Sequence, residues 1–527
     1  MNKRLRIADW LLLIAVPAFF FLWKLSSFGL IGADEPRYAQ IAREMLARHD
    51  WITPTLSGIP WLEKPPLYYW QAMVAYALFG VSDWSARLPS VLDAWLLVLA
   101  VYWFMQRIRQ GSELDSALVT ATMAGIVGFA RAASTDMPLA ATFTIAMFAW
   151  YAWVETGITR YLAVSYLFIG LATLAKGPVA PLLAIAIIVL LAALQRSFQI
   201  VWKTFWIPGL LLFSATTLPW YVFVQIRNPQ FFHEFIIEHN LARFGTNIYH
   251  HTAPFWYYVP VTLLGWMPWS LAIVIALILA IRQVRRHNIN ALQRFLIIWI
   301  AIVVIFFSIS QSKLPGYVLP ALPAGAILTA EFIREDATGK NIAGFPRTIV
   351  AVLQALLIAI LLFGALNIQT LILWHRISWN AAVIPLVIAA AAGAGIFLLL
   401  VKSNLQVFRI TTLAPTILIL AIALRLGARL LDDKLSARPV AVELNSLNAH
   451  HLPVAVFLIP RETQFGLEFY LNQVIPRYEL RQVPAGEHLL VAAEGYPKGV
   501  AKVAGSKITY LGRFAPQRLE VFYVAAR

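Results

Sequence analysis

The sequence predicts an all-α polytopic membrane protein with a small soluble α/β domain at its C-terminal end. Of its 527 residues, 60% are hydrophobic and only 13% are charged, whereas soluble domains carry about 25% charged residues. The apolar residues recur in blocks of about 18 to 24, each long enough to cross a hydrocarbon core as a helix. Helices satisfy their own backbone polar groups inside a membrane, which is why we predict this class.

The charge and the cysteine count narrow the possible partners. The net charge is +16, but most Lys and Arg residues lie in short loops between apolar blocks, where they orient helices. We therefore expect contacts with anionic lipid or phosphate and none with nucleic acid. Because the chain has no cysteine, any metal must be bound by histidine and carboxylate side chains.

The N-terminal end predicts a retained first membrane helix. A basic start, Met1 to Arg6, precedes an apolar run over 10–31 that lacks a small-residue cleavage site. If the basic end lies inside, Asp34 and Glu35 emerge at the outer face. The outer loop 32–85 then contains two expected interfacial helices, Tyr38 to His49 and Pro66 to Gly80. If the second of these crosses the membrane instead, the parity of later spans changes.

The remaining apolar blocks bring the expected total to about thirteen spans. After the first, they cover 86–103, 116–130, 138–154, 161–175, 178–195, 205–224, 257–281, 293–310, 315–333, 346–366, 377–401 and 408–427. Parity places the most basic short loop, 282–287, on the inner side, as the distribution of Lys and Arg requires. An odd number of spans places the C-terminal end outside. The transmembrane domain is thus expected over 1–430.

The composition changes after the last span. Residues 453–460, 488–493, 508–511 and 519–524 are short strand-like runs, and a helical pattern lies at 462–473. We therefore predict a small α/β domain over 436–527 on the outer side of the membrane.

The segment after the first helix carries the strongest chemical signal. Asp34 and Glu35 are adjacent, and Arg37 and Tyr38 follow within one turn. Two carboxylates beside an arginine allow one to stay ionised as a base or charge stabiliser while the other positions a partner. The alternative is an ordinary acidic helix start.

Further ionisable residues fall on the same predicted face. They are Glu63, Lys64, Arg131, Asp136, Lys176, His239, Arg243, His250, His251 and Lys313. Charges in the middle of spans are almost absent, whereas a transporter would be expected to place some there. The pattern indicates an enzyme that acts on lipid head groups, and a lipid-linked sugar flippase is the alternative from another class. Glu63 and Lys64 could also be a plain turn, and Asp136 could either pair with Arg131 or hold Arg37.

Two kinds of binding group stand out in this set. Lys64, Lys176, Arg243 and Lys313 are natural phosphate partners. Glu63, one of the histidines and substrate phosphate oxygens would suit zinc or another divalent metal. The nucleotide-binding patterns GxGxxG after a strand and GxxxxGK[ST] are missing, so a sugar or phosphoryl donor would have to arrive as a lipid.

Several motifs together resemble the bacterial aminoarabinose transferases, which are relatives of the protein O-mannosyltransferases. The matching runs are Gly32 to Ala39, Trp61 to Trp70, Arg131 to Asp136, Ala175 to Pro178, Glu238 to Phe244 and Ser312 to Pro320. The resemblance covers the whole membrane part in order. It implies the GT-C glycosyltransferase fold, and transfer of 4-amino-4-deoxy-L-arabinose from undecaprenyl phosphate to lipid A at the periplasmic face of the inner membrane.

The resemblance also implies roles for individual residues. Asp34 resembles the catalytic aspartate of the family, Arg37 and Asp136 its ionic partners, and Glu63 a metal-coordinating carboxylate. Lys64, Arg243 and Tyr317 resemble contacts to the carrier phosphate. His239 is the expected metal-binding histidine, with His250 or His251 as alternatives. We also expect substrate contacts from Glu35, Tyr38, Arg131, Lys176 and Lys313. The alternative within this fold is transfer of another lipid-linked sugar to lipid A, a glycan or a protein.

Overall fold

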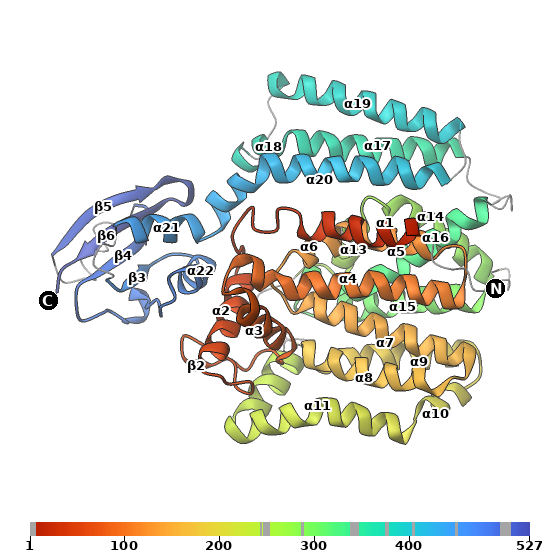
Figure 1. Cartoon of the computed structure of the whole chain (residues 1–527), viewed down its shortest axis with the longest axis horizontal. Coiled ribbons are helices and arrows are strands. Elements are labelled where there is room, and N and C mark those ends of the chain that lie inside the picture. Colours follow the sequence, from red (N-terminus) through yellow and green to blue (C-terminus); the bar gives the residue numbers. More distant parts are fainter. Residues whose placement is uncertain are drawn as a thin grey trace.

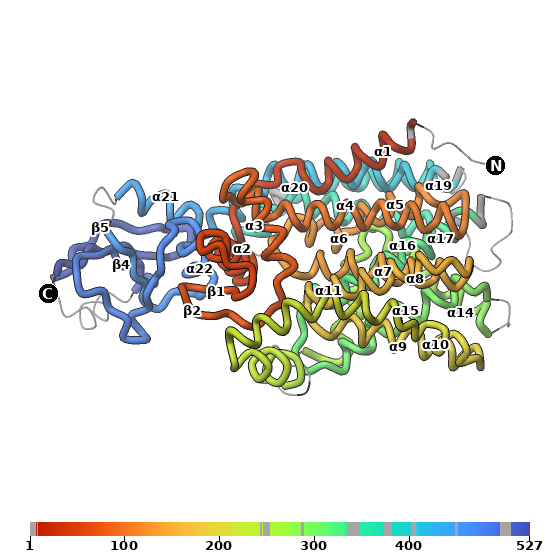
Figure 2. The backbone as a smooth tube through the Cα atoms, turned by 60° about the horizontal axis from the view of Figure 1, so that its bottom comes forward, coloured from red at the N-terminus to blue at the C-terminus, as the bar shows by residue number. Residues whose placement is uncertain are grey.

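The computed structural model describes residues 7–242, 245, 253–285, 289–337, 347–374, 379–402, 406–447, 452–495 and 507–526. Long helices lie side by side in a bundle, and a small sheet domain lies beyond one end of it (Figure 1). Helices α2 and α3 lie between the bundle and the sheet domain in both views (Figure 1, Figure 2). The predicted fold class, a helical membrane protein with a small C-terminal α/β domain, is therefore confirmed.

A helix, or a pair of consecutive helices, occupies each expected span. These elements are α1 and η1 (Ile7–Pro17, Ala18–Leu22), α4 (Asp83–Ile108), α5 and α6 (Glu113–Thr122, Ala124–Ala130), α7 (Asp136–Thr156), α8 (Thr159–Lys176), α9 (Val179–Leu194), α11 (Ile207–Arg227), α13 and α14 (Tyr258–Gly265, Ser270–Arg285), α15 (Ala291–Ile309), η4 and α16 (Pro315–Ala321, Leu322–Ala337), α17 (Arg347–Leu366), α19 (Trp379–Lys402) and α20 (Gln406–Leu435). Shorter helices, α10 (Gln199–Thr204) and α18 (Ile368–Trp374), connect some of them.

Length and composition alone support fewer spans than about thirteen. Among the described residues, seven helices are long and apolar enough to cross a membrane, or up to nine if each bent pair is one span. Asp9–Leu22 and Val179–Leu194 are apolar but shorter. The remaining expected spans are less apolar. Polar residues are tolerated in a helix bundle where the helix is covered by protein, as in α7, for which 83% of the most apolar 18-residue stretch is buried.

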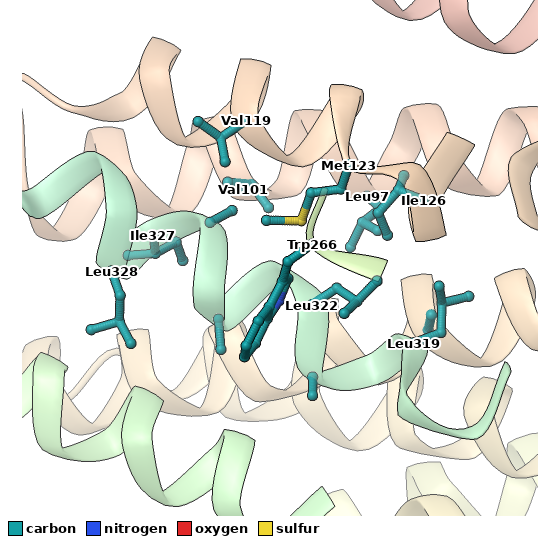
Figure 3. Packing of buried hydrophobic residues seen from close by; sticks show 14 of the residues in the cluster. Leu97, Val101, Val119, Met123, Ile126, Trp266, Leu319, Leu322, Ile327 and Leu328 are labelled. Atoms are coloured by element: carbon teal, nitrogen blue, oxygen red, sulfur yellow. The ribbon is translucent and has the colours of Figure 1, made fainter. Parts of the chain in front are cut away.

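Two of the expected spans are broken instead of continuous. Helices α5 and α6 meet at 63°, and Phe255–Gly265 meets α14 at 117°. The breaks contact each other, because the backbone amide of Ala124 donates to the carbonyl of Met267 at 2.7 Å. Figure 3 shows apolar side chains, among them Met123 and Trp266, packed at this point.

The first span is shorter than predicted. Helical structure ends at Leu22, whereas the apolar run predicted a helix to residue 31. The backbone then continues without a regular helix until α2 (Asp34–Ala47) begins. We call residues 23–33 the strap. Its carbonyl groups are bound by two buried arginines, as described below, and these bonds replace those of a helix.

The outer segment is buried more deeply than an interfacial segment would be. It contains α2, the strands β1 (Thr55–Leu56) and β2 (Ile59–Pro60), and α3 (Leu67–Phe79). Tyr38 and Met45 of α2 pack with Tyr68 and Tyr69 of α3 and with Phe469 of the C-terminal domain. The interfacial helix predicted at 38–49 is present as α2, and both α3 and α22 of the C-terminal domain pack against it.

The C-terminal domain begins where α20 ends. It consists of α21 (Arg438–Leu447), β3 (Val454–Phe457), α22 (Arg461–Leu471), β4 (His488–Ala493), β5 (Ile508–Phe514) and β6 (Leu519–Val524), with 3-10 turns η5 (Tyr478–Leu480) and η6 (Ala515–Gln517). The strand order is β3-β4-β6-β5, with β3 parallel to β4 and the other pairs antiparallel. Helix α22 faces α2 (Figure 2).

A buried carboxyl group lies at the contact of α22 with α2. Glu468 is 1% exposed, accepts a hydrogen bond from the hydroxyl of Ser57 at 3.0 Å and another from Gln464 at 3.2 Å, and lies near Glu44 of α2. Burial, together with the charge of Glu44, raises the pKa of Glu468 to about 7 from its usual 4.5. The folded protein therefore binds a proton here that the unfolded chain releases at lower pH.

We expect this group to make the protein less stable as the pH rises. Because the pKa of Glu468 is higher in the folded state, its contribution is fully present below about pH 4.5 and is lost as the pH rises through about 7. Glu468→Gln should remove this dependence and raise the melting temperature at pH 8, with little change at pH 5. Thermal unfolding in detergent between pH 5 and 8 measures it, and Glu462→Gln, on an exposed carboxyl of the same helix, is the control. Parallel curves for Glu468→Gln and the wild type would contradict the expectation.

Candidate active site

The first turn of α2 presents one carboxylate toward solvent. The side chain of Asp34 is 49% exposed, and its Oδ1 accepts a hydrogen bond from Nη2 of Arg37 at 2.5 Å. Arg37 itself is 11% exposed and lies over the rings of Tyr38 and Trp61, at 5.1 and 5.0 Å from their centroids. Aromatic faces and a carboxylate both favour a cation. Arg37 is therefore a fixed positive charge beneath an accessible carboxylate.

The electrostatics of Arg37 place Glu63 in the same neighbourhood. Burial by itself lowers the pKa of Arg37, but Tyr38, Asp34 and Glu63 outweigh burial and raise the pKa above its ordinary value. The guanidinium is thus charged at every accessible pH, as arginine almost always is. Two segments about thirty residues apart in the chain meet here, since Glu63 follows the β1–β2 hairpin.

Glu35, the neighbour of Asp34, has a structural role. It is 6% exposed, and Arg87 of α4 donates to both of its oxygens, at 3.2 and 2.8 Å. The backbone amides of Ile31 and Ala133 donate to the same carboxylate at 2.9 and 2.8 Å. With its oxygens bound inside the protein, Glu35 does not face the substrate, so the predicted substrate contact was wrong.

Arg131 also binds protein backbone instead of substrate. It is 7% exposed, and its guanidinium donates to the carbonyls of Phe20, Trp23 and Lys24, at 3.2, 2.9 and 2.9 Å. Arg87 continues the pattern with the carbonyls of Leu25, Phe28 and Gly29, at 2.9, 2.9 and 2.8 Å. These two arginines hold the strap, and both the predicted substrate role of Arg131 and its alternative pairing with Asp136 are corrected.

Asp136 and Lys176 form the second charged pair of the site. The ammonium of Lys176, at the end of α8, contacts Oδ1 of Asp136 at the start of α7 and lies 4.7 Å from the ring centroid of Tyr317. The expected contact of Asp136 with Arg37 is replaced by this one. Gly316 makes the approach possible, because a Cβ there would lie 2.6 Å from the carboxylate of Asp136.

Lys176 and Tyr317 border a cavity of about 260 Å³ whose walls are mostly apolar. Its lining comprises Lys64, Lys176, His239, Asn240, Ser310 and Tyr317, and the apolar Leu139, Pro178, Val179, Leu182, Leu241, Phe306 and Phe307. The lining comes from five widely separated segments of the chain. Lysine side chains beside apolar walls suit a lipid that carries a phosphate head group.

Glu63 and His239 approach each other beside this cavity. Nε2 of His239, on the π-helix η2 (Phe232–Ala242), lies 3.9 Å from Oε1 of Glu63. Among the described residues no group of three or more His, Asp or Glu side chains could hold a metal. Glu63 and His239 would supply two protein donors, one fewer than a catalytic zinc site usually has, so ligand oxygens would have to complete the coordination. The alternative histidines, His250 and His251, and the phosphate partner Arg243 lie outside the described residues.

Two further predicted contacts lie apart from the cavity. Tyr38 is 3% exposed and belongs to the aromatic cluster of α2 and α3. The ammonium of Lys313 donates to the carbonyl of Ser310, and burial lowers the pKa of Lys313. The ring of Tyr38 therefore packs against the guanidinium of Arg37. Lys313 stabilises the turn that leads to Tyr317.

The sequence analysis missed two residues that the structure makes important. Arg87 is fully buried and makes five hydrogen bonds, although a charged residue near the start of an apolar block is a visible signal. Gly316 follows Pro315 in a turn, but nothing local indicates that a carboxylate from α7 packs against it.

The chain is similar in sequence to known membrane glycosyltransferases. The dolichyl-phosphate-mannose-protein mannosyltransferase family matches residues 63–223. The undecaprenyl phosphate-alpha-4-amino-4-deoxy-L-arabinose arabinosyl transferase of Aeromonas salmonicida is 28% identical, over 93% of this chain and 91% of its own. The enzyme of the same description from Photorhabdus laumondii is 31% identical, over 57% of this chain and about half (54%) of its own.

The fold has a solved counterpart over nearly the whole chain. The crystal structure of ArnT from Cupriavidus metallidurans bound to undecaprenyl phosphate matches with a TM-score of 0.79 and 22% identity, covering 98% of each chain. Its apo state matches with a TM-score of 0.77. The solved counterpart shows the fold, a polytopic helical membrane protein with a small C-terminal sheet domain. Over most of its length, the chain is a homologue of the bacterial aminoarabinose transferases at 28% identity.

Proposed function

We propose that the protein transfers 4-amino-4-deoxy-L-arabinose from undecaprenyl phosphate to a phosphate group of lipid A, at the periplasmic face of the bacterial inner membrane. The observation that carries the proposal is the cavity in which Lys64, Lys176 and Tyr317 meet an apolar wall. A polyprenyl phosphate has the matching chemistry, an anionic head on a hydrocarbon chain. The relatives named above are described as undecaprenyl phosphate-alpha-4-amino-4-deoxy-L-arabinose arabinosyl transferases, which supports the donor in this proposal.

The geometry suggests how the residues divide the work. The bond between the anomeric carbon and the carrier phosphate breaks, and an oxygen of the acceptor phosphate forms the new bond from the opposite face, with inversion. Lys64 and Lys176 stabilise the charge that grows on the leaving phosphate. The acceptor phosphate is already largely ionised at neutral pH, so it needs little deprotonation.

Asp34 is placed to act on the sugar or on the acceptor. Its carboxylate is exposed and is held by the buried Arg37. A fixed negative charge there orients the acceptor and stabilises positive charge that develops at the anomeric carbon. Tyr69, a neighbour of Arg37, is fully buried, and its hydroxyl has no acceptor among the described residues. Burial raises the pKa of Tyr69, so the group remains a donor for a ligand.

The proposal is tested by mass spectrometry of lipid A. Cells that express the protein should add the mass of one aminoarabinose residue to lipid A, and cells without it should not. Purified protein with synthetic donor and lipid A should give the same product. Addition of a different mass would assign another sugar, and an unchanged lipid A in the purified reaction would reject the proposal.

We also propose that Glu63 and His239 hold a divalent metal, with zinc the first choice. Such an ion would neutralise charge on the carrier phosphate when bound. We expect the purified protein to contain about one metal ion per chain, measured by elemental mass spectrometry, and expect Glu63→Gln and His239→Ala each to lower the metal content tenfold or more. His233→Ala is the control, because His233 is exposed on the same helix and pairs with Glu238. Equal metal content in all four proteins would refute the site.

A further inference from the structure

The strap is bound on two sides by different parts of the chain. Arg87 and Arg131 bind its carbonyl groups from the bundle side, as described above. The C-terminal part binds its amide groups. The amide of Gly29 donates to Oδ1 of Asp432 at 2.7 Å, and the amide of Leu30 donates to the hydroxyl of Tyr470 at 2.7 Å. Ile31 forms an isolated antiparallel bridge with Ser436. The next amide, that of Ile31, donates to Glu35, so the bound segment leads directly into the first turn of α2.

The contact between the strap and the C-terminal part is close. A Cβ at Gly29 would lie 2.2 Å from the hydroxyl of Ser436 and 2.5 Å from that of Tyr470. It would also lie 3.0 Å from Cβ of Arg438. Only glycine fits at this position, since three side chains surround its backbone. The C-terminal part is thus packed directly against the backbone of the strap and has no space in which to shift.

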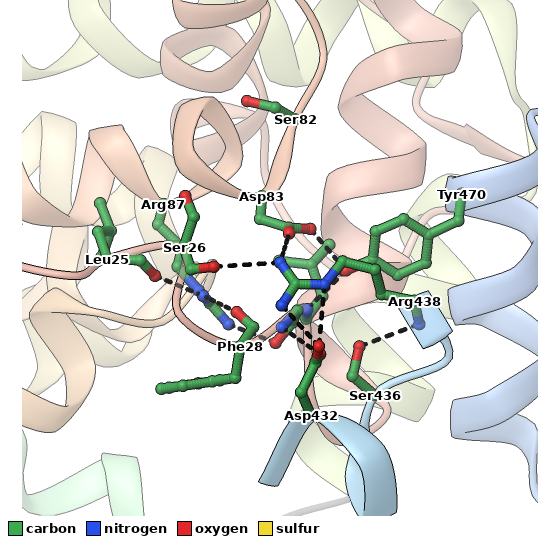
Figure 4. A network of polar contacts seen from close by, with 12 residues as sticks. Leu25, Ser26, Phe28, Ser82, Asp83, Arg87, Asp432, Ser436, Arg438 and Tyr470 are labelled. Carbon is green, nitrogen blue, oxygen red and sulfur yellow. Dashed lines mark hydrogen bonds and ion pairs between the residues drawn. The ribbon is translucent and has the colours of Figure 1, made fainter. Parts of the chain in front are cut away.

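A charged network fixes these C-terminal side chains to α4 (Figure 4). The hydroxyl of Tyr470 donates to Oδ1 of Asp83 at 2.5 Å, and Arg438 donates to Oδ2 of Asp83 at 2.7 Å. Arg438 also binds Oδ2 of Asp432 at 2.6 Å and the carbonyl of Ser26 at 3.1 Å. Asp83, the first residue of α4, is 7% exposed. Buried charged hydrogen bonds of this kind are geometrically specific and costly to break singly.

We propose that the C-terminal domain positions the catalytic carboxylate, with Tyr470 as a positioning residue. The hydroxyl of Tyr470 accepts from the strap and donates to α4, so it sets the distance between them. The strap ends at Asp34, and α2 is held from its other face by Arg43, which donates to the carbonyl of Phe469 at 2.6 Å. The domain therefore holds α2 at its start and along its length. The inference rests on the proposed function of Asp34 and gives the C-terminal domain a role in catalysis without contact with substrate.

The test uses Tyr470→Phe, which removes only the hydroxyl group, in the full-length protein. We expect kcat for transfer to fall about five- to tenfold, the effect of one lost buried hydrogen bond on a positioned group, while KM for the lipid-linked donor stays the same. We also expect amide hydrogen exchange in residues 26–33 to become faster. Asp432→Asn, which weakens the bond to the amide of Gly29, should shift both measurements in the same direction. Tyr510→Phe is the matched control, since Tyr510 is 56% exposed on β5.

The two readouts separate this proposal from the proposed function. Hydrogen exchange needs no substrate, so it tests the contact with the strap even if the wild type transfers another sugar. Unchanged exchange and unchanged kcat in Tyr470→Phe would overturn the positioning role. A second outcome would also overturn it: Tyr470→Phe lowers the melting temperature, and hydrogen exchange of residues 26–33 rises no more than that of the C-terminal domain.

Discussion

Asp34→Asn is expected to lower the rate of sugar transfer by about 10²- to 10⁴-fold, the range seen when a positioned catalytic charge is removed. Asparagine keeps the shape of the side chain and loses the negative charge that we propose acts on the sugar or the acceptor. Because Asp34 is half exposed and Arg37 remains packed over Trp61, the fold should not change. Single-turnover transfer with purified protein measures the effect, and binding of the lipid-linked donor should be nearly unchanged.

The control for this substitution is an exposed carboxylate in the C-terminal domain, which does not line the cavity. Glu462→Gln, in the first turn of α22, makes the same chemical change on an exposed residue, and it should retain the wild-type rate. Transfer by folded Asp34→Asn at near the wild-type rate would show that Asp34 is not the catalytic carboxylate and would leave Asp136 as the next candidate.

The largest expected effect on stability belongs to Arg87→Met. This change leaves the carboxylate of Glu35 buried with two amide partners but no cation, and it frees three carbonyls of the strap. Breaking a buried ion pair from one side costs about 3–5 kcal/mol. We expect most of the variant to unfold or aggregate on extraction, as measured by size-exclusion chromatography and thermal unfolding in detergent.

A double substitution distinguishes the cost of the unpaired charge from the cost of the lost packing. Arg87→Met with Glu35→Gln removes both charges, so it should recover part of the stability that Arg87→Met loses. Arg160→Met, on an exposed arginine at the start of α8, should change the stability by no more than about 0.5 kcal/mol. A stable, monodisperse Arg87→Met protein would mean that the strap is held by other contacts.

Much of the fold could be predicted from the sequence because a membrane imposes a simple rule. Each apolar block long enough to cross the bilayer must be helical there, and a helix or helix pair lies in each expected block. The exceptions arise where other parts of the chain supply backbone partners. Helix α5 ends before Met123 because Ala124 bonds to a distant carbonyl. The first span ends at Leu22 because arginines from α4 and from the segment after α6 bind carbonyl groups of the strap.

The sequence predicted many of the residues at the candidate site, but it predicted their individual roles less well. One-sided topology grouped Lys64, Lys176 and His239, the family resemblance added Tyr317, and all four line the cavity. The roles of Glu35 and Arg131 were wrong, because side-chain direction is not visible in a list of loop residues. Adjacent positions on a helix point about 100° apart, so Asp34 faces solvent while Glu35 faces Arg87.

The sequence by itself determined that this protein is a bundle of membrane helices with its charged residues outside the middle of the spans, because hydrocarbon accepts helices and excludes charge. It also predicted a lipid phosphate as the ligand, since Lys and Arg residues occur in the loops between apolar segments. Only the tertiary structure decided that Asp34 is exposed while Glu35 is buried, and that the C-terminal domain forms hydrogen bonds with the strap. These depend on contacts between residues as much as 440 positions apart, and a local pattern carries no information about such pairs.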